Sequence, residues 1–306
     1  MKRSIIALAL LACSAALAQG TEQTPAQRDI MVIAHLLPGL WDNGEQVEFA
    51  PRVKNGATYP HAQTRIERIA APAFGEFAFR ERTSAPDASV TLLKLDPASA
   101  RNIRMSFYAP APGNADGTKL GAGDWVAKGC PIVFTREAGQ FSAEAAKDCT
   151  TAPAVAAAML TPTKLWIEQR LADKPAQPFT RYSRAREFEC YVDMPGASGN
   201  RAVLFRRTSG LMIHDQAGVA WFDSPETPSR RLGVKLRAVD WPVNTAPGIF
   251  TRDSLTLYVE EMAKDGTTKT LFYGWTEPTA SRIGLNNTAM LVNCSSEPMA
   301  LAKPEF

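Results

Sequence analysis

The stretch GLWDNGEQVEF, at residues 39–49, decides how the chain is built. It lies between the only strongly periodic helical pattern and a long run of β-type alternation. Gly39, Asn43 and Gly44 are residue types that accept turns and positive φ. Trp41 adds a large apolar ring beside the carboxylate of Asp42. The sequence therefore predicts that a helix ends here, that β structure begins, and that polar chemistry lies against an aromatic surface.

A helix is predicted before this stretch, from residue 24 to residue 37. Thr24 suits the N-cap, Pro25 suits the first turn, and Gln27 completes a capping box. One apolar stripe follows with helical spacing, at Ile30, Ile33, Ala34 and Leu37. His35 lies beside the stripe, and we expect it at the edge of the helix interface rather than as a ligand.

The rest of the chain alternates with period two, which is typical of strands. The run IRMSFY at 103–108 places its apolar residues on one face. Eight short runs of this kind follow between residues 187 and 294, separated by Gly, Pro, Asp and Asn. Such spacing predicts a sheet that closes or folds back on itself. We expect a mainly β, antiparallel fold with a linker at 173–178.

Residues 1–18 are typical of an export signal. Lys2 and Arg3 precede a short apolar run, and ALA at 16–18 fits a cleavage site after Ala18. A second interpretation takes LLAC at 10–13 as a lipoprotein box, with Cys13 lipidated and holding the protein at a membrane. Both predict a protein outside the cytosol, in the periplasm or secreted. Removal of the segment leaves 32 basic against 31 acidic side chains, a net charge of +1, which argues against a nucleic-acid partner.

Four cysteines remain in the mature chain, and an even number in an exported protein predicts disulfides. Of the three possible pairings we expect Cys130–Cys149 and Cys190–Cys294, because each pair then lies within one half of the chain. A catalytic thiol is disfavoured, because none of the three histidines lies near a cysteine in sequence. The sequence has no CxxC or HxxxH spacing, so no metal site is predicted.

Three features of residues 27–175 belong together. The first is the helix followed by GLWDN at 39–43 and by Gln46. The second is His61, followed by a strand that ends in Arg80 and Glu81. The third is GC at 129–130, an aromatic strand, GQF at 139–141 and Cys149. As a set they resemble the CpcT/CpeT family of phycobiliprotein chromophore lyases, while residues 180–300 have no counterpart in that family.

This resemblance implies an antiparallel, calyx-like β-barrel, similar to a lipocalin, over residues 19–178, with a second antiparallel β section over 179–306. It implies an apolar ligand, a bilin or other tetrapyrrole, and a partner protein whose cysteine accepts the pigment. No cofactor is expected besides that ligand. Six residues would line or shape the calyx: Trp41, Asp42, Asn43, Gln46, His61 and Glu81.

The chemistry of a bilin lyase needs an apolar slot, cations for the propionates and a carboxylate that moves a proton. Asp42 and Glu81 are the candidate catalytic carboxylates. Trp41, Phe77 and Phe79 are candidates for stacking on the pigment rings. The plainer alternatives are an Asx turn for Asp42 and a surface ion pair with Arg80 or Arg82 for Glu81.

A group of arginines near the start of the second half could bind propionates, or could line a solvated strand face. Its members are Arg181, Arg184, Arg186, Arg201, Arg206 and Arg207. His214 and Asp215 offer a histidine–carboxylate pair, which a hairpin loop also explains. The function expected from these residues is an exported apolar-ligand calyx, with lyase activity implied by the resemblance. The alternative is a non-enzymatic envelope protein that binds a lipid-like molecule or another protein.

Overall fold

The computed structural model describes residues 23–52, 58–84, 88–149, 155–169, 179–195, 206–245 and 248–296, with the backbone alone at 52, 169, 239–245 and 248–252. The predicted export segment with Cys13 and Ala18, the predicted linker at 173–178, and Arg201 lie outside the described residues. No helix within the described ranges is long and apolar enough to cross a membrane.

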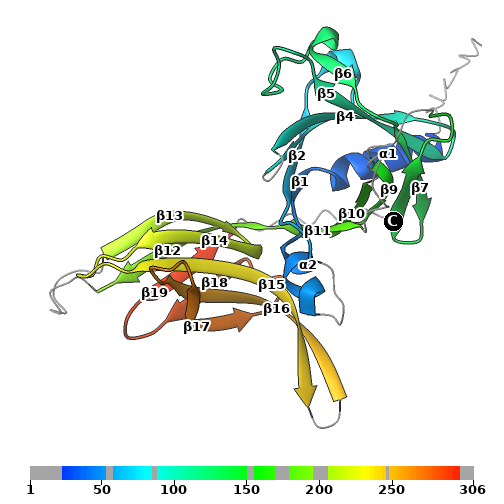
Figure 1. Cartoon of the computed structure of the whole chain (residues 1–306). Helices are drawn as coiled ribbons and strands as arrows, with labels where there is room; N and C mark the ends of the chain where they lie inside the picture. The colour runs from blue at the N-terminus through cyan, green and yellow to red at the C-terminus, as the bar shows by residue number, and fades with distance from the viewer. Residues whose placement is uncertain are drawn as a thin grey trace, which may run out of the picture.

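Among the described residues, ten strands close into an antiparallel barrel, as the sequence and the resemblance predict (Figure 1). Around the ring the order is β4-β3-β2-β1-β11-β10-β9-β8-β7-β5, and a β5–β4 pairing closes it. A short strand, β6 (Trp125–Ala127), pairs with the end of β5. The bounds are β1 (Gly39–Asp42), β2 (Gln63–Ile69), β3 (Ala78–Thr83), β4 (Ser89–Pro97), β5 (Asn102–Pro110), β7 (Ile132–Glu137), β8 (Gln140–Ala145), β9 (Val155–Leu160), β10 (Lys164–Gln169) and β11 (Thr180–Ala185).

Helix α1 (Pro25–Leu36) closes one end of the barrel. Its predicted capping box is confirmed, because the Thr24 side chain accepts from the Gln27 N–H at 3.2 Å and the Gln27 side chain accepts from the Thr24 N–H at 2.8 Å. The apolar face of the helix, including Ile30 and Ile33, packs with inward-facing strand residues in one buried cluster. Burial of this face contributes to stability in proportion to the apolar area removed from water.

Two local predictions are wrong in detail. The chain after Asp42 forms helix α2 (Gly44–Phe49) and the turn η1 (Ala50–Arg52), rather than continuing as β structure. The strand predicted to end in Arg80 and Glu81 is β3, which starts at Ala78 after the turn of η2 (Pro72–Phe74) and Gly75, at φ 90°, and runs on to Thr83. A third short turn is η3 (Ala122–Asp124).

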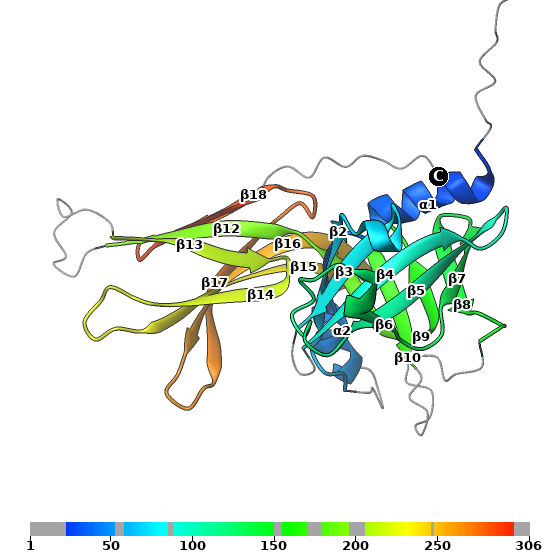
Figure 2. The same ribbon diagram turned by 90° about the horizontal axis from the view of Figure 1, so that it is seen from above.

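The second half of the described chain forms two four-stranded antiparallel sheets around a core of their own. The orders are β13-β12-β19-β18 and β14-β15-β16-β17. The bounds are β12 (Glu187–Met194), β13 (Arg206–His214), β14 (Gln216–Asp223), β15 (Arg231–Thr245), β16 (Gly248–Met262), β17 (Thr268–Thr276), β18 (Arg282–Asn286) and β19 (Leu291–Ser295). We call this part the sandwich; it extends to one side of the barrel (Figure 2).

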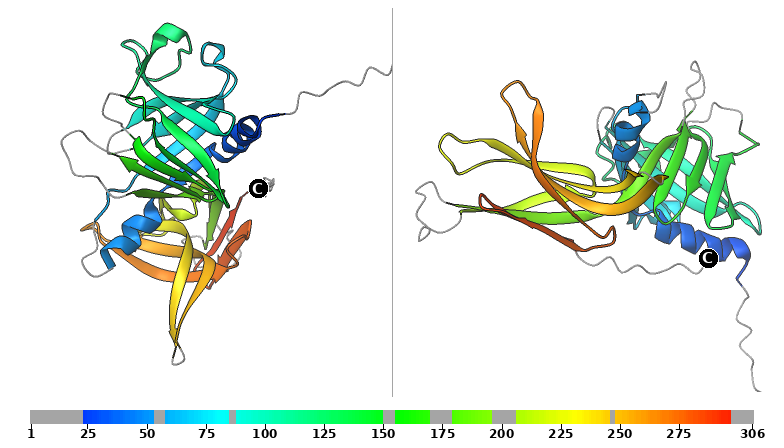
Figure 3. Two further views of the ribbon diagram at one scale, coloured as in Figure 1. Left: turned by 90° about the vertical axis from the view of Figure 1, so that its right-hand side faces the viewer. Right: turned by 90° about the horizontal axis from the view of Figure 1, so that it is seen from below.

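The expected division at residue 178 falls one strand before the sheets change. β11 pairs with β10 and with β1, so it belongs to the barrel sheet, and the sandwich begins at β12. Helix α2 lies between the two parts and contacts β11 and β14 (Figure 3). Because His214 of β13 also lies beside Asp42 of β1 and Gln63 of β2, the barrel and the sandwich meet along α2, β1 and β2.

Both predicted disulfides are confirmed. Cys130–Cys149 closes the hairpin of β7 and β8, and Cys190–Cys294 joins the paired strands β12 and β19. The first loop spans 19 residues and the second spans 104. Each bridge thus links segments within one part of the molecule, as expected from the two halves of the sequence.

Candidate functional site

Trp41 and Asp42 are neighbours on β1, and the strand sends their side chains to opposite faces of the barrel wall. Trp41 lies in the interior core with no exposed surface, and its Nε1 donates to the Leu37 carbonyl at 2.9 Å. Asp42 is equally buried, but it faces outward, toward the sandwich. Gly39 enters this strand at φ 146°, a conformation that favours glycine.

The barrel interior changes character from one end to the other. Near α1 the inward side chains are apolar and buried, as with Phe79, Ile103 and Phe134. Toward the opposite end, Glu81, Phe107 and Ile167 are only half-buried although they face inward. We call this end the mouth. The barrel is therefore filled at the helix end and reached by solvent at the mouth.

Glu81 is the carboxylate of the interior. It lies two residues after Phe79 on β3, so both side chains share the inward face. Thr64 Oγ1 donates to Glu81 Oε1 at 3.2 Å. Burial raises the pKa of Glu81 above its ordinary value, and the charge of Lys128 opposes that shift. Arg80 pairs with Glu67, so it does not form the surface ion pair that was the alternative for Glu81.

Tyr182 completes the polar patch around Glu81. It belongs to the interior cluster and is 7% exposed. Burial, followed by the charges of Glu81 and Asp42, raises the pKa of Tyr182 to about 12. The phenol therefore stays protonated across the physiological range and can donate a hydrogen bond. Thr64, Glu81 and Tyr182 thus place two hydroxyls and one carboxyl among apolar side chains.

The two phenylalanines predicted to stack on a ligand lie differently. Phe79 is fully buried in the core. Phe77 is partly buried at its edge, with the Arg68 guanidinium 5.2 Å from its ring centroid. Phe107, which the sequence reasoning did not select, is the aromatic ring that faces the mouth. Its alternating strand pattern marked the inward face, but nothing in the sequence marked the open end.

Asp42 belongs to a second polar cluster, outside the barrel wall. His61 Nε2 donates to Asp42 Oδ2 at 2.9 Å, and Gln63 Nε2 donates to the same oxygen at 3.2 Å. His214 Nε2, from the sandwich, lies 3.8 Å from Asp42 Oδ2 and 2.9 Å from Gln63 Nε2. Asp42 also accepts from the Gly44 N–H at 2.6 Å, so the Asx turn exists alongside the histidine contact.

The two histidines of this cluster shift in opposite directions. The hydrogen bond to Asp42 raises the pKa of His61, whose side chain is 56% exposed. Burial lowers the pKa of His214 despite the nearby carboxylate. His61 thus favours its charged form and His214 its neutral form.

The amides of Asn43 and Gln46 hold backbone rather than face the barrel interior. Asn43 donates to the Pro60 carbonyl at 2.9 Å and accepts from the Ala62 N–H at 2.8 Å. Gln46 donates to the Phe179 carbonyl at 2.8 Å and accepts from the Arg181 N–H at 2.9 Å. Both side chains therefore fix the segments that flank β2 and β11.

The described arginines of the predicted group do not converge on one point. Arg184 lies 4.3 Å from the Trp41 ring centroid and donates to the carbonyls of Leu36, Pro38 and Pro162. Burial lowers its pKa to about 10. Arg186 is bound to Asp215 and to two carbonyls, while Arg207 pairs with Asp193. These contacts anchor helix α1 and strands of the sandwich.

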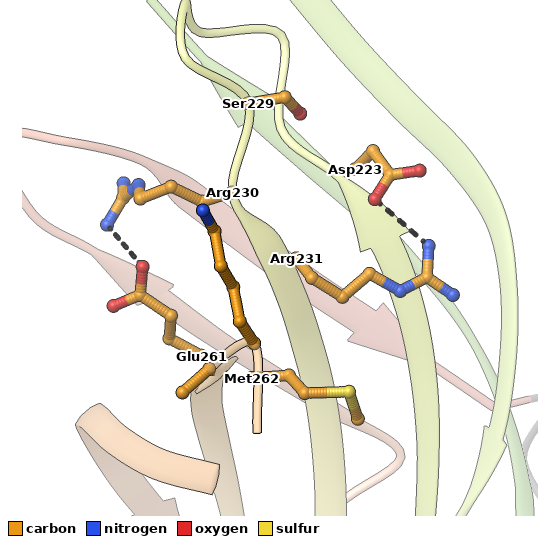
Figure 4. Close-up of a pocket in the computed structure, with 8 residues that line it drawn as sticks. Asp223, Ser229, Arg230, Arg231, Glu261 and Met262 are labelled. Carbon is orange, nitrogen blue, oxygen red and sulfur yellow. Dashed lines mark ion pairs between the residues drawn. The ribbon is translucent and has the colours of Figure 1, made fainter. Parts of the chain in front are cut away.

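An open hollow of about 590 Å³ lies on the sandwich, at the ends of β14, β15 and β16 (Figure 4). Figure 4 shows two ion pairs in it, Arg230–Glu261 at 3.8 Å and Arg231–Asp223 at 3.2 Å. Because each guanidinium already faces a carboxylate, we assign no ligand to this hollow.

Comparison with solved structures gives a likeness to a known protein. No family model matches the chain, and no curated protein matches it. The chain is similar to the structure of the T-type phycobiliprotein lyase CpeT from Prochlorococcus phage P-HM1, with 13% sequence identity and a TM-score of 0.34. The match covers 52% of this chain and 98% of the phage protein. A likeness at this level leaves the function to the geometry of the barrel itself.

Proposed function

We propose that the barrel is a calyx that takes an apolar ligand through its mouth. The observation that carries this proposal is the carboxyl of Glu81, held beside Thr64 and Tyr182 in a largely apolar interior that solvent reaches from one end. An apolar slot with a few convergent polar groups and a shifted pKa is the usual form of a small-molecule site.

The ligand class follows from the same chemistry. A long, flat molecule with apolar edges and a few N–H groups fits beside Phe107, with Glu81 accepting a proton or hydrogen bond. A linear tetrapyrrole has this chemistry, and it is the ligand implied by the resemblance to the CpcT/CpeT family. The charge of Lys128 acts on Glu81, and this ammonium group would pair with a propionate of the ligand.

If the family reaction carries over, a thiol of an acceptor protein adds across a carbon–carbon double bond of the pigment. Sulfur bonds to one carbon, and the thiol proton goes to the pigment, so no electrons are gained or lost. Glu81 is the residue proposed to carry that proton. Asp42 is assigned no part in this step, because its carboxylate faces the outside of the wall.

The second candidate is a non-enzymatic binding protein that holds a lipid-like molecule in the same calyx. It is favoured by the buried apolar cluster of the barrel interior, because a lipid-like ligand needs apolar contacts and no cation.

An absorbance titration of residues 19–306, with disulfides formed, tests the proposal. Biliverdin and haem are the probes. A saturable red shift with one-to-one stoichiometry supports a tetrapyrrole calyx, and transfer of the pigment to a cysteine-bearing acceptor then separates lyase from binder. No spectral change with either pigment, in protein shown to be folded by circular dichroism, would leave the lipid-like binder as the working hypothesis.

A further inference from the structure

The sheet β14-β15-β16-β17 has one face in the sandwich core and one face turned away from it. Leu232, Val234 and Leu236 of β15 have no exposed surface and lie in the core. Residues between them on the strand therefore point to the other side. We call that side the outer face; it carries Trp221, Gly233, Lys235, Tyr258, Tyr273 and Trp275.

The register places these residues in rows across the sheet. Trp221 lies opposite Gly233, Lys235 lies opposite Tyr258, and Tyr258 lies opposite Tyr273. Trp275 lies one row further along β17, opposite Thr256. Four aromatic rings thus share one side of a single sheet, on its two edge strands and on β16.

The rings lie where a flat ligand can reach them. Tyr273 is 60% exposed and Trp275 is 54% exposed. The rings of Tyr258 and Tyr273 are 5.9 Å apart between centroids and tilted by 32°. Trp221 lies flat over Gly233, since a Cβ at that glycine would come within 2.7 Å of the indole. Glycine at this position is what lets the ring lie against the sheet.

The charges on this face are balanced. Lys235 pairs with Glu260 at 3.4 Å, and Arg237 pairs with Glu48 of helix α2 at 3.0 Å. Among its described side chains, the outer face therefore presents hydrogen-bonding groups between its rings without an excess of either sign. Such a surface does not match nucleic acid or an anionic membrane, which attract a net positive patch.

We propose that the outer face binds a neutral polysaccharide. A pyranose ring has an apolar C–H face that stacks on an aromatic ring, and hydroxyls at its edge that bond to neighbouring polar side chains. Tyr273 and Trp275 are the stacking residues, and Lys235, the more exposed partner of the Lys235–Glu260 pair, donates to the sugar hydroxyls. The absence of net charge on the face selects an uncharged polymer over an acidic one.

The test is native gel electrophoresis of the mature chain in gels that contain hydroxyethyl cellulose, xylan, galactomannan or glycogen, with alginate as the acidic polymer. Wild-type protein is expected to be retarded by at least one neutral polymer. Truncation of an exposed anchor ring removes most of its contact, so Tyr273→Ala and Trp275→Ala should each weaken binding about tenfold. The two variants are made separately, so the test can be completed with whichever of them folds.

Matched controls separate ring stacking from loss of any surface residue. Tyr273→Phe keeps the ring and should retain binding, while Met212→Ala alters a residue that is 61% exposed on β13 of the other sheet and should change nothing. The proposal is overturned if no neutral polymer retards the folded protein, or if alginate alone does. It is also overturned if sedimentation velocity shows self-association that Trp275→Ala abolishes, because the face would then bind a second copy of the chain.

Discussion

Asp42 and Glu81 lie on opposite faces of the same barrel wall, separated by strand β2. Asp42 is opposite Gln63 and Glu81 is opposite Ile66, and these two β2 positions are three residues apart. An odd separation on a strand reverses the face. The two carboxylates that the sequence offered as catalytic candidates therefore belong to different sites, one inside the barrel and one at its contact with the sandwich.

Replacement of Glu81 by glutamine is expected to stabilise the protein at high pH. A raised pKa means that the folded state binds this proton more tightly than the unfolded chain, so stability falls as pH rises above the ordinary pKa of 4.5. Glu81→Gln removes that loss. Urea unfolding should give equal stabilities near about pH 4 and a more stable variant near about pH 8. Glu76→Gln, at a side chain that is 71% exposed, is the control. A less stable Glu81→Gln variant at the higher pH would mean that the ionised carboxylate has a favourable partner.

The pKa of His61 should exceed 6.5, and it should fall when Asp42 is replaced by asparagine. Stability from this contact is complete below the ordinary histidine pKa and is lost as pH rises through the raised value. NMR titration of the imidazole protons measures both histidines at once. His214 should titrate below 6.5 because burial lowers its pKa. A His61 that titrates identically in wild-type and Asp42→Asn protein would contradict the assigned hydrogen bond.

Loss of the Arg184 side chain should loosen the helix end of the barrel. Arg184→Met keeps much of the aliphatic contact with Trp41 but leaves three carbonyls without their donor. We expect a loss of about 2–4 kcal/mol in the free energy of unfolding. Arg181→Met changes an exposed arginine over the Trp166 ring and should cost far less. Equal losses in the two variants would show that Arg184 does not anchor the helix.

Removal of the two disulfides should have unequal effects. In the chain-entropy model, the 19-residue loop contributes about 3 kcal/mol and the 104-residue loop about 5 kcal/mol. Paired alanine variants, Cys130→Ala with Cys149→Ala and Cys190→Ala with Cys294→Ala, should therefore differ in unfolding midpoint. A larger loss from the shorter loop would point to native-state packing rather than loop entropy.

Local signals in the sequence were enough for α1, its cap, the two cysteine pairs and the β class. Each of these predictions depends on residues that are close in sequence or on the number of cysteines in the chain. The role of Asp42 was not accessible in this way, because its partner His214 comes from a strand that only the sandwich places there. Tyr182 was missed for a related reason. It lies next to the predicted linker, and only the pairing of β11 with β10 and β1 brings it inside the barrel.

The resemblance predicted a barrel that carries Glu81 and Trp41, but it did not say which residues face the interior and which face outward. Asn43 and Gln46 illustrate this limit, since their amides bond to backbone on either side of β1. The sequence analysis placed Trp41 and Asp42 together in the calyx, whereas adjacent residues on β1 face opposite sides of the wall. Which face was the interior depended on the closure of the barrel.

The most direct test of a ligand inside the barrel compares two neighbours on β5 that face opposite ways. Phe107 points into the mouth, while Tyr108 points out and packs its ring 5.0 Å from that of Phe74. Biliverdin should be titrated against wild-type, Phe107→Ala and Tyr108→Ala protein, each shown to be folded. Binding weakened only by Phe107→Ala is the predicted result. Binding that is weakened by Tyr108→Ala and not by Phe107→Ala would place the ligand outside the barrel and contradict the calyx.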